Sequence, residues 1–318
     1  MPYGQYPREG NEPFLRELIL KDAVFLLGRR FWPAAAAAAP RLDKPAVKAI
    51  VVACNTATAY GLADIRGAID RWGVPVRVVG VVEAGARGVL QSDRAGRDDE
   101  AVAVLATVGT CASMAYPRAI AAAFGRAGRR VPRVVQRGSA DLAGAIEGDP
   151  AVAARTTVEQ AIAADVAALV DEQRRDADAR PVGTVVLGCT HFPLVREAIV
   201  AEFMRLRDTA ADGGRLVAET IEVVDPASLA ARELFRTLAA QRLRAPAARA
   251  PDLPDLFFMS VAGPAADETA PADKFHRVPG RLGVEDTRVV PMRADLLPPT
   301  SRALIRTRLP HVWRTLGW

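Results

Sequence analysis

Short apolar runs that lead directly into helical patterns are the main feature of the sequence. Runs rich in β-branched residues predict strands at residues 46–53, 76–82, 101–106 and 182–188. Apolar runs of this length are typical of parallel strands that are buried on both faces. Helices are predicted at residues 57–72, 115–126, 149–171, 194–207 and 226–244, with a short helix opening at 139–141 and a basic amphipathic helix within 300–318. Alternating strands and helices predict an α/β fold with open parallel sheets flanked by helices.

Proline, glycine and alanine mark the connections between these elements. Six alanines between two prolines at residues 33–40 predict a surface insertion. Residues 91–99 are interpreted as a crossing between domains, and residues 244–254 and 262–273 as loops.

Two cysteines occupy matching places in this pattern. Cys54 and Cys189 each follow a predicted strand, have a threonine nearby and precede a helical segment. This weak internal duplication predicts two similar domains whose strand ends face one another. In open α/β sheets, ligands bind at the carboxyl ends of the strands, so we expect the active site in a cleft between the domains. The predicted domains are residues 1–95 with 213–318, and residues 96–212.

The position of these cysteines suggests acid–base chemistry. A helix N-terminus carries about half a positive charge and unpaired N–H groups, and is expected to lower the pKa of a nearby thiol. Asn55, Thr56 and Thr190 add amide and hydroxyl groups suited to a carboxylate or an ammonium group. A single free cysteine is more often a small buried hydrophobic residue. A matched pair favours a symmetric reaction, in which Cys54 and Cys189 exchange protons with opposite faces of one carbon.

Composition and charge argue against several other functions. The chain has 42 Lys and Arg against 37 Asp and Glu, and these charges are scattered, so no nucleic-acid partner is expected. No apolar run reaches the length of a membrane span, and the N-terminus does not resemble a secretory signal. We therefore expect a cytoplasmic protein without a membrane partner. Three cysteines and three histidines are too dispersed for a metal site.

The cysteine turns read VVACNTATAYGL at residues 51–62 and VVLGCTHFPLV at residues 185–195. Both resemble the signature turns of the glutamate racemases, within the cofactor-independent aspartate/glutamate racemase superfamily. Four further stretches are similar to this family: VVGVVEAGARGVL at 78–90, ATVGTCASMAY at 106–116, VVDPASLAARELFRTL at 223–238 and LFFMSVAG at 256–263.

The resemblance implies an isomerase that interconverts L- and D-glutamate for peptidoglycan synthesis, without pyridoxal phosphate or another cofactor. Glutamate would be its small-molecule partner, with a homodimer as a possible assembly. By the resemblance, Cys54 acts on D-glutamate and Cys189 on L-glutamate, while His191 assists proton transfer at Cys189. The resemblance also implies a set of substrate-binding and supporting residues: Tyr3, Gly4, Asn55, Thr56, Thr110, Thr190 and His191, supported by Glu147 and Thr107.

The sequence departs from the family pattern ahead of Tyr3 and Gly4. The family's first strand ends in an Asp-Ser-Gly motif, which this sequence does not contain at that place. We therefore expect the activity of this chain to be absent or weak. Two alternatives remain open: an aspartate or hydantoin racemase of the same superfamily, and a non-catalytic protein that binds a dicarboxylate.

Overall fold

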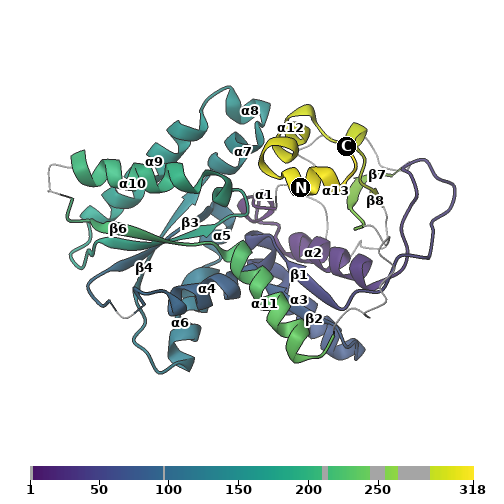
Figure 1. Cartoon of the computed structure of the whole chain (residues 1–318), viewed down its shortest axis with the longest axis horizontal. Helices are drawn as coiled ribbons and strands as arrows, with labels where there is room; N and C mark the ends of the chain where they lie inside the picture. The colour runs from purple at the N-terminus through teal and green to yellow at the C-terminus, as the bar shows by residue number, and fades with distance from the viewer. Residues whose placement is uncertain (1–2, 96, 210–213, 244–254, 264–286) are drawn as a thin grey trace. The chain divides into compact units, whose positions relative to one another are not determined.

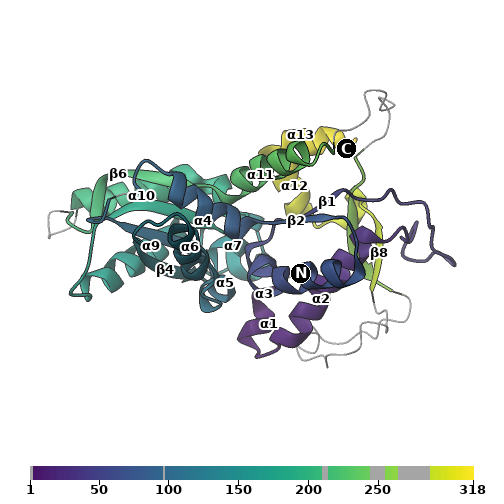
Figure 2. The same ribbon diagram turned by 90° about the horizontal axis from the view of Figure 1, so that it is seen from below.

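The computed structural model describes residues 3–95, 97–209, 214–243, 255–263 and 287–318, which form two compact units (Figures 1 and 2). The first unit comprises residues 1–50, 63–78 and 236–318, and the second comprises 51–62 and 79–235. Strands β1 and β2 pair in a two-stranded sheet. Four elements include residues of both units: β1 (Ala49–Val52), α3 (Asn55–Trp72), β2 (Arg77–Gly80) and α11 (Pro226–Ala240).

A four-stranded parallel sheet forms the middle of the second unit. In spatial order its strands are β4 (Arg133–Ser139), β3 (Ala101–Thr107), β5 (Val182–Gly188) and β6 (Val217–Val224). Every neighbouring pair is parallel, so the strands end at the same edge of the sheet. All seven residues of β5 are buried, which explains its continuous apolar sequence. The predicted α/β class, with a parallel sheet flanked by helices, is confirmed.

Helices cover both faces of this sheet. Helices α7 (Leu142–Glu147), α9 (Val158–Arg174) and α10 (Arg196–Thr209) pack on one face, and α4 (Val81–Gln91) and α6 (Ala115–Arg126) on the other (Figure 1). Leu105 of β3 belongs to the same core as Phe203 of α10, whereas its neighbour Val104 joins Phe124 of α6. Burying each phenylalanine contributes about 1.5–3 kcal/mol. Three shorter elements complete the unit: α5 (Val108–Ala112), α8 (Pro150–Ala153) and η1 (Phe192–Val195).

The first unit combines helices with an antiparallel strand pair, β7 (Phe258–Ala262) and β8 (Thr287–Pro291). The ring of Phe258 contacts Phe25 and Phe31, each with a centroid separation of 5.3 Å. None of the helices in the described part of the chain is long and apolar enough to cross a membrane. The remaining elements are α1 (Gln5–Arg8), α2 (Glu12–Leu27), η3 (Ala294–Leu296), α12 (Pro299–Arg308) and α13 (Pro310–Thr315).

The alanine-rich insertion at residues 33–40 contacts an arginine of the same unit. Arg288 of β8 donates hydrogen bonds to the carbonyl oxygens of Ala35 and Ala37, at 2.7 and 2.8 Å. Its guanidinium also stacks 3.7 Å from the ring centroid of Trp32. Most residues of the insertion are exposed, so the predicted surface position is confirmed.

Several predicted boundaries move for identifiable reasons. The helix predicted at 149–171 is two helices, because Thr157 starts α9 with a capping box: Gln160 N–H donates to Thr157 Oγ1, and Thr157 N–H donates to Gln160 Oε1. The predicted strand at 76–82 ends at Gly80, and Val81 opens α4. Helix α2 and strands β4, β6 and β8 were not predicted. The predicted loop at 244–254 lies outside the described residues. The predicted loop at 262–273 also lies outside them, except for residues 262 and 263.

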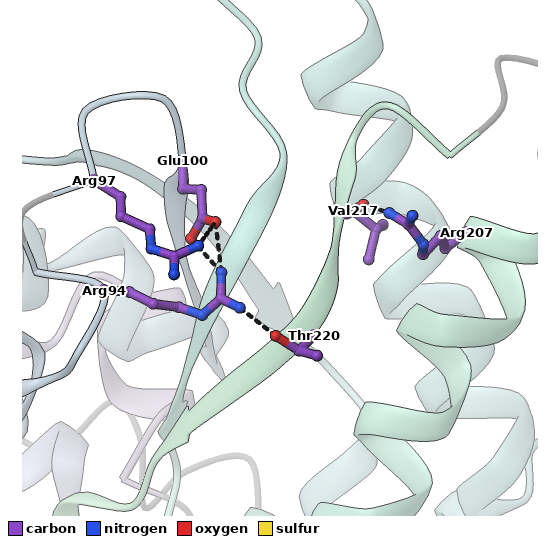
Figure 3. Close-up of polar contacts among 6 residues, drawn as sticks. All are labelled: Arg94, Arg97, Glu100, Arg207, Val217 and Thr220. Carbon is purple, nitrogen blue, oxygen red and sulfur yellow. Dashed lines mark hydrogen bonds and ion pairs between the residues drawn. The ribbon is translucent and has the colours of Figure 1, made fainter.

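Residues 91–99, predicted to connect the two domains, lie within the second unit. Arg94 binds the carboxylate of Glu100 and the hydroxyl of Thr220 on β6, and Arg97 donates to Glu100 at 3.0 Å (Figure 3). A Cβ at Gly183 of β5 would overlap this carboxylate, so a larger residue there would require the Glu100 side chain to shift. On the same strand as Thr220, Val217 accepts a hydrogen bond from Arg207 at 2.7 Å (Figure 3).

These contacts explain why the compact units do not follow the predicted domain limits. The loop contacts β5 and β6, and residues 214–235 belong to the second unit. The division into 1–95 with 213–318 and 96–212 stays a prediction.

Candidate active site

Cys54 lies between β1 and the N-terminus of α3. The backbone N–H of Ala57 points at its sulfur, with an N–Sγ distance of 3.4 Å. Burial raises the pKa of Cys54, the Ala57 N–H lowers it, and negative charge on Cys189 raises it further. The expected lowering of this pKa by the helix N-terminus is therefore wrong, because burial outweighs it.

Cys189 directly follows β5 and is 7% exposed. The residue before it, Gly188, lets the end of β5 approach β3 closely. A Cβ at Gly188 would lie 2.7 Å from the Cβ of Ala106 and 3.0 Å from the carbonyl oxygen of Leu105. The glycine is thus needed to place Cys189 at this edge of the sheet.

A chain of polar contacts leads from Cys189 to the surface. His191 Nδ1 lies 3.7 Å from the sulfur of Cys189, and His191 Nε2 lies 2.8 Å from Oε1 of Glu147. The Cys189 sulfur, followed by the Glu147 carboxylate, raises the pKa of His191 to about 10. In return, the hydrogen bond from His191 lowers the pKa of Glu147. The imidazole is therefore cationic at neutral pH and lies between two groups that favour its charge.

Three threonine hydroxyls form a closed triangle. Thr56 of α3 lies 3.2 Å from Thr107 at the end of β3 and 3.0 Å from Thr110 of α5, and the last two are 3.0 Å apart. Thr107 also caps α5 by accepting the N–H of Thr110. Thr110 is completely buried. The triangle collects hydroxyl donors of the kind that bind a carboxylate oxygen.

Asn55 is held by a residue that the sequence did not single out. The hydroxyl of Tyr116, a fully buried residue of α6, donates to Asn55 Oδ1 at 2.7 Å. Asn55 itself is 4% exposed. Tyr116 falls in a helix that the sequence predicted, but nothing in a helical pattern distinguishes a tyrosine that packs from one that also donates.

A sequence profile of the Asp/Glu/Hydantoin racemase family matches residues 27–234, well over half of the chain. The chain belongs to this family.

Racemases are also found by comparison with individual proteins. The chain is 30% identical over 232 residues to a glutamate racemase of Limosilactobacillus fermentum, covering 71% of this chain and 63% of that protein. It is 35% identical over 158 residues to a glutamate racemase of Listeria monocytogenes, covering half of each. The chain thus spans less than two thirds of the length of these relatives.

A crystal structure of glutamate racemase from Francisella tularensis, in complex with D-glutamate, resembles this chain with a TM-score of 0.50. It is 19% identical and covers 77% of this chain and 70% of that one. This likeness supports the α/β fold.

Within the segment that matches the racemase family, the structure brings six of the predicted site residues together in two separate groups of three. Thr190 is exposed at the turn after Cys189. Tyr3 and Gly4 belong to the first unit, where the Tyr3 hydroxyl donates to Asp22. No group of three or more His, Cys, Asp or Glu side chains that could hold a metal occurs among the residues described. One group is Thr56, Thr107 and Thr110, and the other is Glu147, Cys189 and His191, whereas Asn55 contacts Tyr116 and Cys54 contacts the N–H of Ala57.

Proposed function

We propose that this chain interconverts L- and D-glutamate, with Cys54 and Cys189 as the two acid–base groups. The observation that carries the proposal is that both cysteines follow strand ends within one compact unit, and Tyr116 packs against Gly188, next to Cys189, and bonds Asn55, next to Cys54. Two thiols in matched positions fit a reaction in which one gives a proton while the other takes one. Glutamate as the substrate is supported by the identity of 30–35% to proteins named glutamate racemase.

The surroundings of Cys54 suit a group that starts with its proton. Burial favours the neutral thiol of Cys54, and the positively charged imidazole of His191 lies beside Cys189. In the L-to-D direction, the Cys189 thiolate removes the α-proton and forms its S–H bond. Cys54 then gives its proton to the opposite face of the α-carbon and becomes the thiolate. The D-to-L direction runs through the same steps in reverse, and nothing is oxidised or reduced.

The negative charge that develops during proton removal needs fixed donors, because no electron sink is part of the proposal. The triangle of Thr56, Thr107 and Thr110 supplies three hydroxyls for the substrate's carboxylate oxygens. Helices α3 and α5 begin at this point of the unit, and their N-termini favour negative charge. Further substrate contacts are proposed for Asn55, Thr190, Tyr3 and Gly4.

The compartment and assembly are part of the proposal. Cys54 and Cys189 are free thiols, and thiols of this kind stay reduced in the cytoplasm. There the D-glutamate would enter peptidoglycan precursors. The proposed assembly is a homodimer, and sedimentation of the purified chain tests this point.

Racemisation of L-glutamate in D₂O tests the mechanism. We expect the circular dichroism signal to decay slowly, and the D-glutamate formed early to carry deuterium at the α-carbon while the remaining L-glutamate does not. Deuterium in both pools would contradict a mechanism with two separate bases. Cys54→Ser and Cys189→Ser should each abolish racemisation. Cys111→Ser is the matched control, because burial raises the pKa of Cys111 to about 12 and no site contact involves its thiol.

Other outcomes identify the alternatives. Faster turnover of aspartate or a hydantoin than of glutamate would replace the proposed substrate. Calorimetric binding of glutamate without any deuterium at its α-carbon would indicate a dicarboxylate-binding protein instead of an enzyme.

A further inference from the structure

Tyr116 connects the two cysteine turns of the second unit. Its ring packs where two glycines leave room: a Cβ at Gly188 would lie 3.1 Å from Tyr116 Cε2, and one at Gly85 would lie 3.0 Å from Cε1. Gly188 precedes Cys189. At the other end of the side chain, the hydroxyl donates to Asn55, the residue that follows Cys54. One rigid side chain therefore spans from the turn of one cysteine to that of the other.

The phenol is held in its neutral form. Burial raises the pKa of Tyr116 well above its ordinary value, and negative charge on Cys189 acts in the same direction. A neutral phenol always retains a proton to donate. In the structure the phenol donates to Oδ1 of Asn55, so the group that Asn55 has left to offer a ligand as a donor is its NH₂. An NH₂ group suits a carboxylate oxygen and not an ammonium group.

We infer that Tyr116 is a positioning residue for the racemisation, which fixes the Asn55 amide so that its NH₂ group binds a carboxylate oxygen of the substrate next to Cys54. This inference rests on the proposed function. It assigns Tyr116 no contact with the substrate and no proton transfer. Tyr116 affects the reaction only through Asn55. The positioning of Asn55 can therefore be tested separately from proton transfer at the sulfurs.

The first variant is Tyr116→Phe, which keeps the ring against both glycines and removes only the hydroxyl. We expect KM for both enantiomers of glutamate to rise about tenfold, the effect of losing one well-oriented hydrogen bond, and kcat to change less than about threefold. Thr184→Val is the matched control, because it removes a buried hydroxyl near the amino end of β5. An unchanged KM in Tyr116→Phe, with the fold intact by circular dichroism, would overturn the inference.

A double-mutant cycle with Asn55→Ala separates positioning from a general packing role. If Tyr116 acts through Asn55, adding Tyr116→Phe to Asn55→Ala should raise KM no further. An equal rise of KM in both backgrounds would show that Tyr116 acts by another route.

A third measurement does not depend on turnover. The side-chain NH₂ protons of Asn55, followed by NMR in the full chain, should exchange slowly with water in the wild type and at least about tenfold faster in Tyr116→Phe. Unchanged exchange would contradict the inference. Absence of racemisation by the wild type, with this exchange difference present, would instead contradict the proposed function and leave the Tyr116–Asn55 bond established.

Discussion

Replacing Cys189 by serine should lower the pKa of His191 far more than replacing Glu147 by glutamine. In the wild type this pKa is raised from 6.5 to about 10, with the Cys189 sulfur as the larger cause and the Glu147 carboxylate as the second. This order holds although the carboxylate is nearer, at 2.8 Å against 3.7 Å. Half of the Glu147 side chain is exposed, at 51%, so solvent screens its charge.

The magnitudes follow from these surroundings. Raising a pKa from 6.5 to 10 corresponds to about 5 kcal/mol in favour of the charged imidazole. An ion pair with an exposed carboxylate contributes about 1 kcal/mol or less, which is under about one pKa unit. We therefore expect a His191 pKa of about 9 or higher in Glu147→Gln, and of about 7 in Cys189→Ser. The stabilisation of the folded wild type by this charge is complete below about pH 6.5 and is lost as the pH rises through about 10.

Proton NMR of the imidazole Cε1–H group measures both values. The chain contains three histidines, and the signal missing from His191→Asn identifies the relevant one. A wild-type His191 that titrates near pH 6.5, or a larger fall in Glu147→Gln than in Cys189→Ser, would refute this account of the polar chain.

Four further substitutions test the structure of the second unit. Thr110→Val, which removes two hydrogen bonds of 3.0 Å, should reduce the free energy of unfolding by about 1–2 kcal/mol in urea titration; an unchanged midpoint would contradict the hydroxyl triangle. Gly188→Ala should reduce the free energy of unfolding by about 1–3 kcal/mol, because the added methyl group overlaps Ala106. A thermal midpoint equal to that of the wild type would show that β3 and β5 can move apart without loss of stability. Thr157→Ala should reduce the free energy of unfolding by about 1 kcal/mol. Gln160→Ala keeps the Thr157 hydroxyl as the cap of α9, so urea titration should show a smaller reduction.

Much of the second unit could be predicted because its strands are buried on both faces. The limits predicted for β5 and α6 agree with the structure at both ends, since each ends at a clear change of hydrophobic pattern. Helix α4 was missed because Val81 and Val82 continue the β-branched run of β2. Local propensity favours a strand there, whereas Val82 packs in a core with α6, and this tertiary contact favours a helix.

The candidate site was predictable where its chemistry is local. Cys189 and His191 are two residues apart, so their contact follows from one turn of the chain. Glu147 was predicted as a supporting residue from the resemblance, and its contact with His191 depends on how α7 packs. Tyr116 carried no such signal.

The sequence by itself determined that the chain is an α/β protein, that two cysteine turns stand at strand ends, and that they are those of a racemase family. These are properties of short stretches, in which hydrophobic period and residue order are sufficient. Only the tertiary structure decided that Tyr116 reaches Asn55, 61 residues away in the chain, and that burial raises the pKa of Cys54. Desolvation and hydrogen bonding depend on which distant segments pack together, and no local pattern records that packing.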